Sequence, residues 1–242
     1  MTVLVLAAGI AGSALRVALG GGLPKPFLAF AIAAAMGTWL RLQLTERWPR
    51  HGRGMIAANL LGTFVFAVFW KYTPLAVDTA PVLLGGFCGA LTTFSGFVAE
   101  LLRRIAAFDV RGSQRLFALA FVAAFALVFA LVGKEAEPPQ PTFPFGTMAA
   151  NLCGCLLFGV LDQRLRDDAW RRITLGGFLG GLTTFSSLIF ETHQLLCGPR
   201  GANVPAVNLM LTAFGGMALM ALGRFLACPR YNASGDFDAP AP

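Results

Sequence analysis

Eight apolar runs, each about as long as a helix that crosses a lipid bilayer, divide this sequence of 242 residues. They cover residues 3–20, 27–44, 54–70, 81–102, 116–133, 145–161, 173–190 and 205–227. The composition agrees, because 56% of the residues are hydrophobic and only 13% are charged, whereas a soluble domain has about 45–50% and about 25%. A soluble domain and a disordered chain are therefore excluded. The sequence predicts an all-α integral membrane protein with eight transmembrane helices and almost no extramembrane domain.

The residue types that bind metals or activate nucleophiles form no site in the sequence. The cysteines lack the spacing of a metal site. Cys153 and Cys155 are two residues apart, so a helix should point them to different faces. His51 and His193 fall in expected loops. Because no buried His or Asp is available to activate a nucleophile, the sequence does not predict an enzyme.

Positive charge is distributed unevenly between the two sides of the expected membrane. The side that holds both termini carries 14 of the 19 Lys and Arg residues: Arg41, Arg47, Arg50, Arg53, Arg103, Arg104, Arg111, Arg115, Arg164, Arg166, Arg171, Arg172, Arg224 and Arg230. The other side carries the remaining 5: Arg16, Lys25, Lys71, Lys134 and Arg200. The positive-inside rule then places both termini in the cytoplasm of a multi-pass plasma-membrane protein. This bias explains the net charge of +7 without a nucleic-acid partner. The polar tail 229–242 is expected to be disordered.

Two pairs of runs repeat each other. The segment LGGFCGALTTFSGFVAE (84–100) matches LGGFLGGLTTFSSLIFE (175–191) at 11 of 17 positions, and GMIAANLLG (54–62) matches GTMAANLCG (146–154). The third and fourth runs thus recur as the sixth and seventh, which cross the membrane in the opposite direction. This is an inverted-topology repeat, and such repeats place a site near the bilayer midplane, between the two halves.

A weaker match links the first two runs. GSALR (12–16) and GTWLR (37–41) both have Gly-x-x-x-Arg near the end of a run, and the two runs are antiparallel. We therefore divide the chain into a first unit (23–134) and an inverted second unit (135–228). The first helix (1–22) is then the displaced first helix of the second unit.

Few polar residues lie deep in the runs, and those that do are duplicated. Asn59 and Asn151 occupy equivalent positions, as do the motifs Gly89–Ser95 and Gly180–Ser186. Glycines with paired β-branched threonines disfavour a regular helix, so we expect a local break in the membrane centre. The alternatives are that the asparagines only bridge helices and that the hydroxyls bond their own backbone. Amides, hydroxyls and phenyl edges together suit a small anion better than a cation.

These motifs resemble the Fluc (CrcB-like) family of fluoride channels. The resemblance covers most of the chain: Gly-x-x-x-Arg, Gly-x-x-x-x-Asn-x-x-Gly and the duplicated Gly-x-x-Thr-Thr-Phe-Ser. It implies passive, selective export of cytoplasmic fluoride through two narrow pores that flank the unit interface, and relief of fluoride toxicity. Typical members are four-helix units that pair as antiparallel homodimers. This chain resembles a fused form, a monomer that acts in the lipid bilayer as an intramolecular pseudo-dimer.

The resemblance also implies site residues. Carbonyls of Gly89, Thr92, Gly180 and Thr183 would hold a central structural sodium ion, the implied cofactor. The fluoride pores would be lined by Asn59, Asn151, Phe94, Phe97, Phe185, Thr93, Thr184, Ser95, Ser186 and Thr212.

The second copy departs from the family pattern, because Leu188 replaces its later phenylalanine. In the family each aromatic pair takes its earlier Phe from one unit and its later Phe from the other. Phe185 with Phe97 is then complete, while Phe94 with Leu188 is not. The last run carries Asn208 and Thr212, which could form the family's polar track, but the fifth run offers no hydroxyl. We therefore predict one competent and one degenerate pore.

Two other functions stay open on the sequence. A secondary transporter, such as a fluoride/proton antiporter or small-solute exporter, has similar repeats and broken helices, although proton coupling normally needs an intramembrane carboxylate. A non-transporting membrane scaffold explains the small residues but not the duplicated Asn and TTFS motifs.

Overall fold

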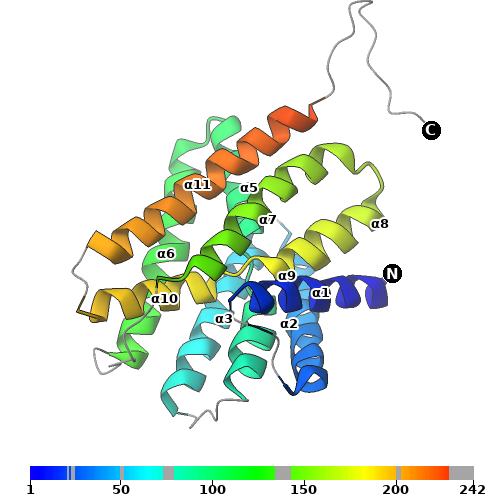
Figure 1. The fold of residues 1–242 in the computed structure, drawn as a ribbon. Coiled ribbons are helices and arrows are strands. Elements are labelled where there is room, and N and C mark those ends of the chain that lie inside the picture. Colours follow the sequence, from blue (N-terminus) through cyan, green and yellow to red (C-terminus); the bar gives the residue numbers. More distant parts are fainter. Residues whose placement is uncertain are drawn as a thin grey trace, which may run out of the picture.

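The computed structural model describes residues 1–20, 22, 25–49, 52–72, 79–133, 143–199 and 203–228. Over these ranges the secondary structure is helical, and eight spans are long and apolar enough to cross a membrane (Figure 1). This confirms the predicted all-α membrane architecture. Six spans are single helices: α1 (Thr2–Gly20), α2 (Phe27–Arg47), α3 (Arg53–Tyr72), α6 (Val110–Val132), α7 (Phe145–Arg164) and α11 (Asn203–Ala227). The tail 229–242 lies outside the described residues.

The two repeated spans are built from several pieces each. The fourth span consists of the π-helix η2 (Pro81–Cys88), the short α4 (Gly89–Leu91) and α5 (Phe94–Ala106). The seventh consists of α8 (Asp168–Arg171), the π-helix η3 (Arg172–Leu179), α9 (Gly180–Leu182) and α10 (Ser186–Cys197). π-Helical turns inside longer helices are rare, and those that occur often lie at functional sites. Their presence at matching positions extends the repeat from sequence to backbone.

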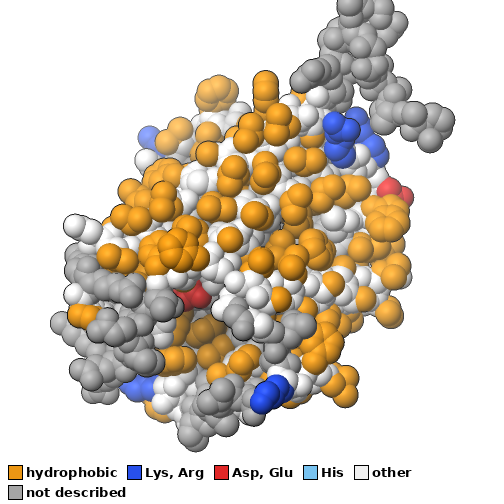
Figure 2. Space-filling view, in the orientation of Figure 1, with side chains coloured by type: hydrophobic (Ala, Val, Ile, Leu, Met, Phe, Trp, Pro, Cys, Tyr) orange, Lys and Arg blue, Asp and Glu red, His pale blue; other side chains and the backbone are white. Residues whose placement is uncertain are grey.

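These two broken spans form the centre of the molecule. In their most apolar stretches 67% and 72% of the residues are buried, against 28–44% in the six unbroken spans. The outer helices cover them: α7 packs along α11, α3 packs along α6, and α1 and α2 pack on the broken spans. Hydrophobic side chains cover most of the face shown in Figure 2, and Lys and Arg lie toward its edges, as a lipid-facing surface requires.

Several predicted boundaries and one predicted environment were wrong. Helix α6 begins at Val110 rather than at residue 116, because the Asp109 side chain accepts a hydrogen bond from the Gly112 N–H (2.9 Å) and caps the helix. Helix α10 continues to Cys197 rather than ending at residue 190. His193 is therefore in a helix and fully buried, not in a loop. Its ring packs against Phe129 and Phe190, so protein and not lipid surrounds it.

Candidate functional site

Each central span breaks at its Thr-Thr pair, as the sequence predicted. Thr92 has φ −95° and ψ 151°, and Thr93 has φ −141° and ψ 129°, so both backbones are extended between α4 and α5. Thr183 has φ −95° and ψ 144° at the end of α9. Here the low helix propensity of β-branched residues coincides with extended backbone in the buried centre.

The duplicated asparagines close these breaks. Asn59 Oδ1 accepts a hydrogen bond from the Thr93 N–H (2.8 Å), and Asn59 Nδ2 donates to the Thr93 carbonyl (3.1 Å). Asn151 makes the same pair of bonds with Thr184, at 2.9 and 3.1 Å. Both asparagines are fully buried. Each amide thus satisfies the backbone groups that the break removes from the helix ladder, which a membrane interior demands.

Six hydroxyl groups connect the two breaks with each other. Thr92 Oγ1 lies 3.2 Å from Thr184 Oγ1 and 3.1 Å from Ser186 Oγ. In the reciprocal set, Thr183 Oγ1 lies 3.2 Å from Thr93 Oγ1 and 3.0 Å from Ser95 Oγ. Thr92 and Thr183 also donate to their own helices, at Cys88 O and Leu179 O. The hydroxyls of Thr92 and Thr183 therefore bond their own backbone, as one sequence interpretation expected, and also bond the opposite broken span, which the sequence did not predict.

The first helices pack symmetrically on the broken spans. A Cβ atom added to Gly37 of α2 would collide with the Phe87 carbonyl of the fourth span. One added to Gly12 of α1 would collide with the Phe178 carbonyl of the seventh span, 91 positions further on. Next to this contact, Ser13 Oγ donates to the Gly181 carbonyl at 3.4 Å. Helix α1 thus contacts the seventh span in the way that α2 contacts the fourth.

The arginines of the Gly-x-x-x-Arg motifs cross over. Arg16 of α1 donates to the carbonyls of Gly89 (2.9 Å, from Nη1) and Gly85, both in the fourth span. Arg41 of α2 donates through Nη2 to the Gly176 carbonyl of the seventh span (2.6 Å). Both side chains are buried, with 5% and 3% exposure. Sequence reasoning placed these arginines near helix ends and missed their role, although their duplication was visible.

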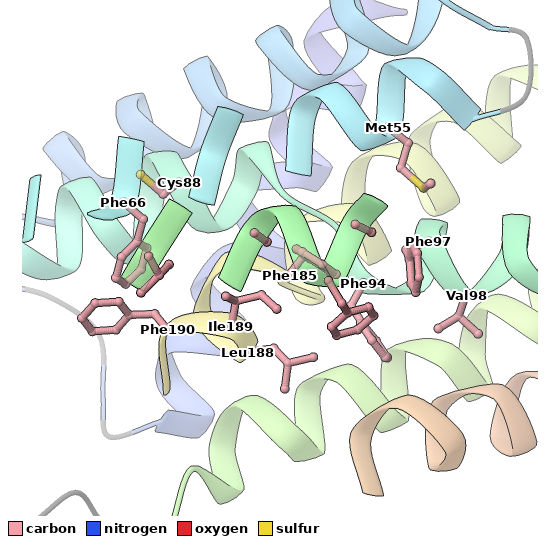
Figure 3. Close-up of a cluster of buried hydrophobic side chains, with 14 of the residues drawn as sticks. Met55, Phe66, Cys88, Phe94, Phe97, Val98, Phe185, Leu188, Ile189 and Phe190 are labelled. Atoms are coloured by element: carbon pink, nitrogen blue, oxygen red, sulfur yellow. The ribbon is translucent and has the colours of Figure 1, made fainter. Parts of the chain in front are cut away.

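The phenyl rings of Phe97, Phe121 and Phe185 pack against one another in the buried centre of the molecule. The centroids of Phe97 and Phe185 lie 5.7 Å apart, so the predicted pair is in contact. Phe121 of α6, which the sequence did not single out, lies 5.5 Å from Phe97 and 5.1 Å from Phe185. Phe94 lies 6.4 Å from Phe97 (Figure 3). All four rings belong to one buried hydrophobic cluster.

Helix α11, which carries Asn208 and Thr212, approaches Phe94 through Gly216. Asn208 Nδ2 donates to Thr192 Oγ1 (2.9 Å), and Thr212 is fully buried one turn later. Gly216 follows on the same helix face, and a Cβ there would lie 2.8 Å from Phe94 Cε1. The sequence placed Thr212 and the pair Phe97–Phe185 in one set of pore residues. In the structure Thr212 belongs to α11, whereas the pair packs against Phe121 of α6.

Comparison with known proteins identifies the family. The family model described as "CrcB-like protein, Camphor Resistance (CrcB)" matches twice, over residues 28–134 and 117–224, and the two matches overlap over residues 117–134. A protein of Haemophilus influenzae (strain PittGG) named fluoride-specific ion channel FluC is 39% identical over 97 residues, which cover 38% of this chain and 75% of the relative.

Two further relatives carry the same name. That of Haemophilus ducreyi is 38% identical over 104 residues, covering 42% of this chain and 79% of its own length. That of Solidesulfovibrio magneticus is 37% identical over 109 residues, covering 41% and 81%. No solved structure matches the chain significantly. Since the family model matches twice and together spans most of the sequence, this chain belongs to the CrcB-like family.

Proposed function

We propose that the chain is a passive, selective fluoride channel that exports cytoplasmic fluoride. The observation that carries this proposal is the pair of crossed helix breaks, each closed by an asparagine, in a chain whose relatives are named fluoride-specific ion channels. The groups gathered there are amide N–H, hydroxyl and phenyl edge, which all present positive potential to a small anion. An inside-negative membrane potential contributes about 2.3 kcal/mol per 100 mV for each charge moved, so export needs no other energy source.

In this proposal one chain supplies both halves of a pseudo-dimer and functions as a monomer. The first unit comprises residues 23–134, and the second comprises 135–228 together with helix 1–22. The equivalent contacts of Gly12 and Gly37 with the two broken spans support this division. The excess of Lys and Arg on one side supports an orientation with both termini in the cytoplasm.

The proposed fluoride pore centres on the complete aromatic pair. Phe97 and Phe185 supply ring edges, while Leu188 leaves Phe94 without a second ring on the other side. The contact of 5.7 Å between the Phe97 and Phe185 centroids supports this choice. Polar groups along the two paths would be Asn59, Asn151, Thr93, Thr184, Ser95, Ser186 and Thr212. Since Thr212 lies on α11, the helix whose Gly216 approaches Phe94, it would belong to the degenerate path.

A central sodium ion, as the family resemblance implies, fits part of the break. The Thr93 N–H donates to Asn59, so the Gly89 carbonyl lacks its usual helix partner, and Gly180 is equivalent. Arg16 occupies one lone pair of the Gly89 oxygen, and a carbonyl has two. The ligands would be the carbonyls of Gly89, Thr92, Gly180 and Thr183. A bound ion would supply positive charge between the two breaks. We expect fluoride efflux to fall when N-methyl-D-glucamine replaces sodium, and unchanged efflux would contradict this site.

The proposed channel is tested by fluoride efflux from reconstituted liposomes. Vesicles loaded with potassium fluoride, in a buffer that contains sodium, receive valinomycin, and an ion-selective electrode follows release; potassium chloride vesicles in the same buffer are the selectivity control. The wild-type chain should release fluoride and retain chloride. Phe97→Ile should abolish release, whereas Phe94→Ile, the matched change on the other side, should leave it. The reverse pattern would assign conduction to the path beside α11, and no release from monodisperse wild-type protein would refute the channel.

Proton-coupled transport is a second candidate because of one buried carboxylate. Glu191 accepts a hydrogen bond from Thr147 Oγ1 (2.7 Å), and its Oε2 is buried without a hydrogen-bond partner among the described residues. Its repeat equivalent Glu100 instead pairs with Arg103 (2.8 Å) and Arg104 (3.0 Å). An internal pH dye that reports proton uptake in step with fluoride release, lost in Glu191→Gln, would favour an antiporter over a channel.

A further inference from the structure

A basic pocket lies outside the proposed fluoride paths, where the start of α3 meets the connection between α5 and α6. Its volume is about 380 Å³. The charged side chains that line it are Arg53, Arg104, Asp109, Arg111 and Arg115. Four arginines and one carboxylate leave three positive charges in excess. All four arginines belong to the arginine-rich side of the expected membrane.

Three of these arginines are exposed and have no partner within the described part of the chain. The side chains of Arg53, Arg111 and Arg115 make no hydrogen bond or ion pair with another described residue. The carboxylate of the pocket is already engaged, because Asp109 Oδ2 accepts a hydrogen bond from Arg104 Nη1 (3.1 Å) and Oδ1 caps α6. The excess charge is therefore open to an anion from outside the chain.

The wall of the pocket is apolar and continues along α6. Ile56 of α3 and Leu116 and Leu119 of α6 line the pocket beside the arginines. Leu116 is buried, whereas Leu119 is 57% exposed, and Val122, one turn further along the same face, is 65% exposed. The arginines thus stand at the end of an exposed apolar strip on a membrane-spanning helix. A ligand that matches both features carries a negative headgroup and an apolar tail.

The repeat does not impose these charges. Aligned through the repeated motifs, the positions equivalent to Arg53 and Arg104 in the second unit are Phe145 and Leu195. The positive-inside rule favours arginines on this side, but it does not require three unpaired arginines from two segments to border one pocket. The pocket is therefore a local feature of the first unit.

We propose that this pocket binds the headgroup of an anionic phospholipid, such as phosphatidylglycerol, in the leaflet on the arginine-rich side. Guanidinium groups match the oxygen geometry of phosphate, and a basic pocket between helices at the cytoplasmic surface suits an anionic headgroup. The acyl chains would lie along Leu119 and Val122, which a free phosphate ion would leave uncovered. The bound lipid would connect α3 with the start of α6, whether or not the chain conducts fluoride.

Lipid binding is measured by calorimetry on the purified full-length chain in a neutral detergent. Short-chain phosphatidylglycerol should bind one saturable site that the double variant Arg111→Gln/Arg115→Gln weakens at least about tenfold. Arg164→Gln/Arg166→Gln is the matched control, because it removes two exposed arginines from the same side that do not line this pocket. Equal binding by all three proteins, or no binding, would overturn the site.

Two further ligands and one further variant test the nature of the site. Short-chain phosphatidylcholine and glycerol phosphate should both bind more weakly than phosphatidylglycerol, because one has no net negative charge and the other no acyl chain. Equal binding of phosphatidylcholine would overturn recognition by charge, and equal binding of glycerol phosphate would overturn the lipid. Arg53→Gln, on α3, should also weaken phosphatidylglycerol binding, and unchanged binding would overturn a site shared by the two segments. Without lipid, each variant should unfold at the wild-type temperature, since the substituted side chains are exposed.

Discussion

Asn59 and Asn151 each use one amide group to stabilise an interrupted backbone. In water a broken helix can bond solvent, but in a membrane every freed N–H and carbonyl needs a protein partner. An amide carries both a donor and an acceptor, so it can satisfy the N–H and the carbonyl of one residue. At these two positions no other side chain of similar size offers the same pair of groups, except the longer amide of glutamine.

Replacing either asparagine by leucine should therefore destabilise the protein. Asn59→Leu leaves the Thr93 N–H and carbonyl buried and unpaired, at a cost of about 1–3 kcal/mol for each group. Asn151→Leu should cost a similar amount at Thr184. The measurement is the thermal unfolding midpoint in detergent. Gln43→Leu removes an amide from an exposed position and should leave the midpoint unchanged. Midpoints equal to wild type in the two asparagine variants would show that the breaks do not depend on these amides.

At the scale of single residues, the sequence reveals candidate site residues when the same residue occurs at equivalent positions of the repeat. Asn59, Asn151 and the paired Thr-Thr segments were found because they occur twice in an apolar setting. Phe121 was missed because it occurs once, among other apolar residues of α6. The carbonyl partners of Arg16 and Arg41 were also missed, since a motif on one helix does not specify which neighbouring span its side chain reaches.

At the scale of elements, hydropathy located the eight spans and misjudged their ends. A run of apolar residues predicts where a helix can cross lipid, but polar residues beyond residue 190 or before residue 116 also remain helical where they are capped or packed by protein. His193 shows the cause, because a hydropathy pattern does not distinguish a protein environment from water. The break at each Thr-Thr pair was predictable, whereas the π-helical turns of η2 and η3 were not.

The packing of α1 and α2 gives a prediction for these elements. Gly12→Val and Gly37→Val should both destabilise the protein by about 1–3 kcal/mol, because each side chain would press on a backbone carbonyl of a broken span. Unfolding midpoints in detergent provide the measurement. Gly20→Val is the matched control, since among the described residues, apart from its own chain neighbours and helix backbone, no atom lies within 4 Å of a Cβ there. If Gly12→Val is tolerated as well as Gly20→Val, α1 does not complete the second unit.

At the scale of the whole molecule, fusion permits a single orientation. A chain that contains both units needs only one insertion direction, and the arginine-rich loops can all lie on one side. The same fusion allows the halves to differ, as seen in the pairing of Glu100 with two arginines and of Glu191 with Thr147.

Cysteine accessibility tests the orientation. In a variant with the five native cysteines replaced, Lys25→Cys should react with a membrane-impermeant maleimide in intact cells, because we place it outside. Arg53→Cys should react only after the membrane is permeabilised. Labelling of both variants in intact cells would indicate mixed insertion, and the opposite pattern would place the termini outside.

The crossed contacts of α1 also set an order of events during synthesis. Ser13 meets Gly181, 168 residues later in the chain, whereas Arg16 meets Gly89 after only 73. At about 5–20 residues per second a ribosome needs roughly 10–30 s to deliver the seventh span, but less than half of that to deliver the fourth. The bond from Arg16 to the fourth span can thus form well before the seventh span, the main packing partner of α1, has been synthesised. In a newborn chain, the contact that joins the two units would form first and keep α1 nearby until the second unit is complete.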